Sequence, residues 1–241
     1  MTEAITNNPL NLRFLNLLSP AETLIVMNGV EADFDLLIQV TFMDLLLKKV
    51  LAITVEERQP SSQDPIQTYK YIGVGEFYKG YTPLLHENMY TDEFGDDWYK
   101  RILLRTFVKD GYDSVNSSGL YRSQIVKNKS LQPYYHQNII QRLNGHFDIN
   151  DAGLLFQAQV KSEFQTAVNY LQSNEGTSET KAALAKQMGG NIFLVKDFEF
   201  GVIQDFSQEL MIAIEQSKTT FTDSIIGFKG WGNSINMGIS W

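Results

Sequence analysis

The sequence predicts an α+β protein that is predominantly helical, and two patterns lead to this fold class. Apolar residues recur at helical spacing over most of the chain, most clearly in residues 151–173. Residues 51–57 and 68–74 instead alternate between apolar and polar side chains with the period of two that strands show. The polar stretch RQPSSQDPIQ between them carries two prolines, so we expect a β-hairpin with a long tip.

The clearest helix start is the tetrapeptide Ser19-Pro20-Ala21-Glu22. Ser as N-cap, Pro at the first helical position and Glu two residues later form a capping box. This helix is expected to end near Met27, because Asn28-Gly29 tolerates the left-handed backbone that terminates helices. A second helix over residues 35–49 has apolar side chains on more than one face, which predicts that it packs on two sides.

Further helices are expected after the hairpin. Thr82-Pro83 again suits the N-cap and first helical positions, which predicts a helix that reaches about Tyr90. The negative charges of Asp96-Asp97 favour a helix N-terminus and predict a helix to about residue 110. The remaining predicted helices span residues 119–129, 132–144, 151–173, 181–188 and 198–218.

Residues 219–241 form a segment rich in glycine and aromatic residues. They include four of the 17 glycines and two of the three tryptophans. The glycines argue against a regular helix, whereas Phe228, Trp231 and Trp241 are large apolar side chains with few local partners. These three aromatic residues are candidate contacts with a partner protein or with the protein's own core.

Helix, tight turn, longer helix and two-stranded hairpin follow one another in the order of a winged-helix unit. Residues 17–94 resemble the winged-helix segment in the cytosolic part of certain uncharacterised bacterial membrane proteins. They are more distantly similar to the start of the Golgi phosphoprotein 3-like family. The resemblance is carried by SPAETLIVMNG, FDLLIQVTFMDLLLKKVLAITVEE, TYKYIGVG and TPLLHENMY. It implies a winged-helix-like unit at 1–94, followed by a helical region at 95–218 and the tail at 219–241.

Charge and composition limit the function classes. The formal net charge of −8 and the pI near 4.9 disfavour a polyanionic ligand, because nucleic-acid affinity comes largely from Lys and Arg that neutralise phosphates. The absence of cysteine excludes disulfides, thiol nucleophiles and cysteine-ligated metals, and it fits a reducing compartment. The N-terminus lacks signal-peptide features and no stretch is apolar enough to span a membrane, so we expect a cytoplasmic protein without a transmembrane segment.

The chain shows no recognisable catalytic motif. It has no Gly-x-Ser-x-Gly elbow, and none of its histidines has the spacing that puts two metal ligands on one helix face. His86 is followed by Glu87, a carboxylate that could orient the imidazole. We expect no metal, no cofactor and no catalytic residue, while an enzymatic role stays open.

A group of cations surrounds the second helix and the hairpin, which are the parts of winged-helix proteins that contact a DNA groove. Acidic residues lie in the same region, so a solvated mixed-charge surface is the alternative interpretation. The candidate contacts with nucleic acid or with a lipid headgroup are Lys48, Lys49, Arg58, Lys70 and Lys79.

The sequence therefore favours a non-enzymatic protein-interaction or scaffold module whose partner is another protein or a second copy of the chain. The first alternative is a winged-helix DNA-binding regulator that uses the cations of the second helix and the hairpin. The second alternative is binding to membrane headgroups, which the resemblance to the Golgi phosphoprotein 3-like family implies.

Overall fold

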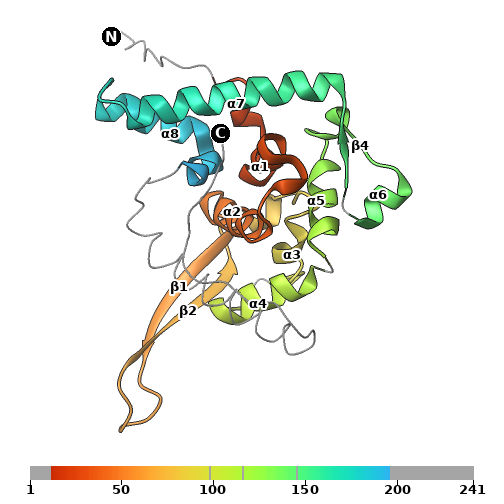
Figure 1. Ribbon diagram of the computed structural model, residues 1–241. Coiled ribbons are helices and arrows are strands. Elements are labelled where there is room, and N and C mark those ends of the chain that lie inside the picture. Colours follow the sequence, from red (N-terminus) through yellow and green to blue (C-terminus); the bar gives the residue numbers. More distant parts are fainter. Residues whose placement is uncertain (1–11, 98, 116, 145, 196–241) are drawn as a thin grey trace, which may run out of the picture.

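The computed structural model describes residues 12–97, 99–115, 117–144 and 146–195. Helices dominate these residues and the strands form two small antiparallel sheets, which confirms the predicted α+β class (Figure 1). Within these ranges no helix has both the length and the apolar composition needed to cross a bilayer. The predicted helix at 198–218 and the tail with Phe228, Trp231 and Trp241 lie outside the described residues.

The described residues form α-helices, short 3-10 helices and strands. The α-helices are α1 (Pro20–Asn28), α2 (Phe34–Leu47), α3 (Asn88–Thr91), α4 (Leu104–Ser114), α5 (Ser118–Val126), α6 (Ile139–Asn144), α7 (Asp151–Gln172) and α8 (Ser178–Met188). The strands are β1 (Leu51–Arg58), β2 (Gln67–Val74), β3 (Ile102–Leu103), β4 (Tyr135–His136) and β5 (Asp148–Ile149). Five 3-10 helices connect them, namely η1 (Leu15–Leu17), η2 (Gly29–Glu31), η3 (Tyr78–Gly80), η4 (Gln132–Tyr134) and η5 (Gly189–Leu194).

The predicted capping box of α1 is confirmed. The Glu22 backbone N–H donates to the Ser19 hydroxyl at 3.3 Å, and the Ser19 N–H donates to the Glu22 carboxylate at 2.8 Å. Gly29 follows the helix with a φ of +60°, a conformation that glycine adopts at low cost. Residues next to α1 in the sequence therefore mark both of its ends.

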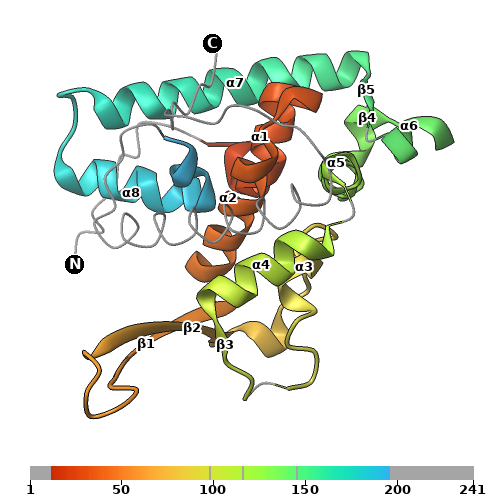
Figure 2. The same ribbon diagram turned by 60° about the horizontal axis from the view of Figure 1, so that its bottom comes forward.

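The predicted hairpin is also confirmed. β1 and β2 pair antiparallel from Leu51 opposite Val74 to Arg58 opposite Gln67. β3 pairs with the other side of β2, so among the described strands the sheet order is β1-β2-β3 and β1 lies at an edge. The hairpin extends away from the helical body (Figures 1 and 2).

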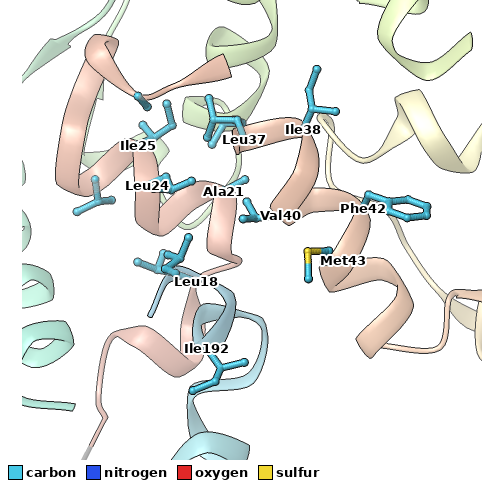
Figure 3. Packing of buried hydrophobic residues seen from close by; sticks show 14 of the residues in the cluster. Leu18, Ala21, Leu24, Ile25, Leu37, Ile38, Val40, Phe42, Met43 and Ile192 are labelled. Carbon is cyan, nitrogen blue, oxygen red and sulfur yellow. The ribbon is translucent and has the colours of Figure 1, made fainter. Parts of the chain in front are cut away.

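One cluster of buried apolar side chains joins elements from most of the described chain. In the close view, Ala21 and Leu24 of α1 lie near Leu37 of α2, and Ile192 of η5 lies near Leu18 (Figure 3). The cluster continues past residue 94 into α4, α5, α7 and α8. The division at residue 94 that the resemblance implies stays a prediction.

The structure corrects the predicted helix that begins at Thr82-Pro83. Residues 81–87 are not helical, and α3 begins only at Asn88. The Glu87 carboxylate accepts a hydrogen bond from the Leu84 N–H at 2.7 Å, which holds this segment as a loop. A side chain thus takes a backbone donor that sits at the predicted start of a helix.

Two other predicted helices begin later than expected. Within residues 96–110, β3 pairs with β2 and α4 starts only after it. Within residues 132–144, η4 and β4 precede the short α6, and β4 pairs with β5. Tertiary strand pairing outweighs the local helical pattern in both places. The predicted helices that became α5, α7 and α8 are confirmed within a few residues.

Aromatic rings connect α2, α3 and α4 around Phe107, which is fully buried. The Phe107 ring lies 5.4 Å from that of Tyr90, 5.6 Å from that of Phe94 and 5.8 Å from that of Phe42. Such ring pairs contribute beyond the area that they bury.

Replacing Phe107→Ala is expected to lower the free energy of unfolding by about 3–5 kcal/mol, because it leaves a cavity among three rings. Urea denaturation followed by circular dichroism measures this change. Phe77→Ala is the matched control, since the Phe77 side chain is 53% exposed and its loss is expected to cost about 0.5 kcal/mol or less. Equal costs for the two variants would contradict the assignment of this core.

Candidate functional site

A pocket of about 670 Å³ opens between segments that are far apart in the sequence. Its walls come from η1 and the start of α1, the end of α2, residues 81–85, the loop 127–130 and residues 187–190. The volume lies in the range of about 300–1,000 Å³ that is typical of ligand sites. We call it the central pocket.

The floor of the central pocket contains the buried carboxylate of Glu22. One of its oxygens accepts the capping bond from Ser19, and the other accepts hydrogen bonds from Asn128 Nδ2 at 3.0 Å and from the Ser130 hydroxyl. Glu22 is 2% exposed. Its oxygens are thus occupied by protein donors, which ties α1 to the loop 127–130.

A second buried carboxylate, Glu87, stands beside the pocket. It accepts hydrogen bonds from the Tyr81 hydroxyl at 2.8 Å and from Lys48 Nζ at 3.4 Å, in addition to the bond from Leu84. Burial first, and then the charge of Glu87, raises the pKa of Tyr81. Tyr81 therefore stays a neutral donor to Glu87 at neutral pH.

Lys48 lies between two carboxylates. Its Nζ is 2.6 Å from the Asp44 carboxylate, one helical turn earlier on α2, and also contacts Glu87. Burial disfavours the charged ammonium, but Asp44 and Glu87 outweigh this effect and raise the pKa of Lys48. Lys48 is therefore a firmly charged part of the pocket floor.

Asp44 is the least well compensated acid of the pocket. Burial raises its pKa, and Lys48 offsets this effect only in part. η5 closes over the carboxylate, since a Cβ added at Gly190 would lie 2.2 Å from Asp44 Oδ1. Glycine at position 190 thus allows the backbone of η5 to approach Asp44 closely.

His86 is fully buried next to this network. Its Nδ1 accepts a hydrogen bond from Asn128 Nδ2 at 3.2 Å, because an amide nitrogen can only donate, so the ring proton sits on Nε2. Nε2 has no hydrogen-bond partner among the described residues. The sequence pointed to Glu87 as the group that could orient this imidazole, whereas the structure assigns that contact to Asn128.

Because of His86, the free energy of unfolding is expected to decrease as the pH is lowered below about 6.5. Burial, followed by the charge of Lys48, lowers its pKa from 6.5 to about 3. Between these values the unfolded chain binds a proton that the folded chain does not, so acid favours unfolding. His86 alone is expected to remove about 2 kcal/mol between pH 7 and pH 5.

The variant His86→Gln keeps an acceptor for Asn128 and removes the titrating ring. Urea denaturation at pH 7 and pH 5 is expected to show a pH-dependent loss that is smaller by about 2 kcal/mol than in the wild type. His136→Gln changes an exposed histidine in the same way and should keep the wild-type difference. If both variants behaved like the wild type, a neutral buried His86 would be ruled out.

The structure does not gather the five predicted cations on one face. Lys48 lies in the central pocket, and Lys49 pairs with Glu76 at 3.0 Å. Arg58 pairs with Glu56 and lies over the Tyr71 ring at 5.7 Å.

The remaining two predicted cations, Lys70 and Lys79, lie on other surfaces. Lys70 is opposite Val55 in the hairpin register and Arg58 is opposite Gln67, so Lys70 and Arg58 project from opposite faces of the hairpin. Lys70 is half-buried, and Lys79 is an exposed residue of η3.

Three further cations at the sheet and the central pocket were not among the predicted contact residues. Arg101 pairs with Glu56 across the sheet and lies over the Tyr71 ring at 5.4 Å, which only the pairing of β3 with β2 could reveal. Lys127 and Lys129 are exposed residues that line the central pocket. Two lysines within three residues were a visible signal, but the pocket beside them depends on distant segments.

The candidate site is characterised by the geometry of the described residues. Within the described residues, no group of three or more His, Asp and Glu side chains is arranged to hold a metal ion. No protein-family model, no curated protein and no solved structure matched the chain.

Proposed function

We propose that the protein is a non-enzymatic interaction module that binds a short segment of a partner protein in the central pocket. The segment would insert an apolar side chain and place acidic residues at the mouth. The observation that carries this proposal is that exposed leucines, together with lysines that have no partner among the described residues, surround one pocket.

The apolar part of the argument rests on side chains that remain exposed at the mouth. Leu17 is 71% exposed and Leu85 is 46% exposed, and both line the central pocket together with Pro83. Exposed apolar side chains that gather around a concavity favour association, because a bound apolar group removes their surface from water. An apolar side chain of a partner fits this environment.

The charge part of the argument rests on Lys127 and Lys129. Both are exposed lining residues, and neither side chain forms a hydrogen bond or ion pair with another described residue. They stand out in a chain whose formal net charge is −8. Acidic residues next to the apolar anchor would pair with them.

The pocket floor supports binding better than catalysis. Glu22 and Glu87 each accept several hydrogen bonds from the protein itself, so their oxygens are held in structural contacts. A general acid or base needs a free site that a substrate atom can reach. Asp44 is engaged with Lys48 in the same way.

The other two functions are less well supported. DNA binding through α2 and the hairpin needs exposed cations on one face, whereas Lys48, Lys49 and Arg58 pair with carboxylates. Headgroup binding would use Lys127 and Lys129 in place of the predicted set, and it is an alternative outcome of the experiment below.

A random peptide library displayed on phage is expected to yield ligands with an apolar residue flanked by acidic residues. Lys127→Glu with Lys129→Glu is expected to weaken the affinity for a selected fluorescent peptide about ten-fold, because two exposed charge pairs become repulsive. Lys161→Glu is the matched control, since Lys161 is exposed on α7 and does not line the pocket. Fluorescence anisotropy measures all affinities.

A second pair of variants tests the apolar contact. Leu85→Ala is expected to weaken peptide binding, whereas Leu155→Ala should leave it unchanged because Leu155 is exposed on α7 away from the pocket. Selected peptides without acidic residues, or binding that ignores both sets of variants, would overturn the proposal. Flotation with anionic vesicles that is lost in the double lysine variant, without peptide selection, would favour the headgroup alternative.

A further inference from the structure

The hairpin offers a second interaction surface that is independent of the central pocket. β1 is eight residues long, lies at the edge of its sheet and extends beyond the helical body (Figures 1 and 2). Such an edge presents backbone donors and acceptors to another strand, and proteins usually shorten or cover it.

Hydrogen-bonded and non-bonded residue pairs alternate along the hairpin, and this alternation determines which residues of β1 direct their backbone groups away from β2. The Gly75 N–H donates to the Val50 carbonyl at 2.7 Å, and Val50 and Gly75 continue the register of the two strands. Bonded pairs alternate along an antiparallel ladder, so the even-numbered residues of β1 bond to β2. Leu51, Ile53, Val55 and Glu57 therefore direct their backbone N–H and C=O groups to the open edge.

The side chains of the same odd-numbered residues lie on one face of the hairpin, which is the face that carries buried Leu51 and Ile72. Beyond the helical body this face carries Ile53 and Val55 of β1, with Lys70 of β2 opposite Val55, and the described residues cover these two apolar side chains only in part. Ile53 is 36% exposed and Val55 is 56% exposed. Within the described part of the chain, the open edge and the exposed apolar strip of Ile53 and Val55 thus belong to one segment.

We propose that β1 pairs antiparallel with β1 of a second copy of the chain, about a two-fold axis at Thr54. In this register Ile53 lies opposite Val55 of the other copy, and Leu51 lies opposite Glu57. The two hairpins join into one continuous sheet, and each helical body lies beside the hairpin tip of the other copy.

The sequence of β1 favours this register over its neighbours. A shift that centres the axis on Val55 places Ile53 opposite Glu57 on both sides and leaves Val55 opposite Val55 as the single apolar pair of outward residues. A shift that centres the axis on Ile53 pairs only residues 51–55 within the strand. The register about Thr54 pairs residues 51–57, sets Ile53 against Val55 on both sides of the axis and opposes no like charges, while Leu51 lies opposite Glu57 at the ends.

A second copy fits this edge better than an unrelated peptide does. The strand is complementary to itself, and the pair Thr54 opposite Thr54 at the axis is a favourable cross-strand combination. Glu56 is already held by Arg58 and Arg101 on the opposite face, so it does not disturb the apolar strip.

Sedimentation velocity of the full chain over a concentration series tests this dimer without any peptide ligand. Thr54 is exposed, so Thr54→Lys and Thr54→Glu are expected to leave the fold intact. Each variant alone places like charges opposite each other at the axis and is expected to raise the dimer dissociation constant about ten-fold. An equimolar mixture of the two variants is expected to restore the dimer, because Lys then faces Glu.

Thr68→Lys is the matched control, since Thr68 is exposed on β2 and does not face the second copy. This variant is expected to dimerise like the wild type. A wild type that stays monomeric throughout the series would overturn the proposal, and so would a dimer that ignores both Thr54 variants. Circular dichroism of each variant separates loss of the dimer from loss of the fold.

Discussion

The buried carboxylate of Glu22 is the interaction on which the rest of the site depends. It completes the capping box that begins α1, and it binds the loop 127–130 through Asn128 and Ser130. Asn128 in turn orients the buried imidazole of His86. A buried charge is stable only when several donors surround it, so these segments must assemble together. One glutamate thus couples helix initiation to the wall of the central pocket.

Local chemistry explains which parts of the fold were predictable. The capping box of α1 and the hairpin depend on residues that are close in the sequence, and both are confirmed. The long α7 was predictable because its apolar stripe repeats over many turns. The short strands β3 and β4 could not be found in this way, because each has only two residues, which are too few to show the alternation of a strand.

The same distinction explains why the candidate site changed. Lys48 lies at the end of a helix, where a cation suits the helix dipole, and its sequence neighbours suggested an exposed surface. Its actual partners include Glu87, which is 39 residues away in the sequence. Lys127 and Lys129 carried a charge signal, but the leucines that make their position a pocket come from η1 and from residues 84–85. Sequence patterns show which side chains are charged, and only tertiary structure shows which of them share a concavity.

The composite origin of the central pocket couples ligand affinity to global stability. Its walls begin at η1 and end at η5, so the binding surface is absent from any state in which one of these segments has detached. A ligand that binds only the folded state adds its binding free energy to that of folding, about 2.7 kcal/mol at a concentration one hundred times the dissociation constant. A ligand bound in the central pocket would therefore stabilise the whole described chain and raise its melting temperature and its resistance to proteolysis.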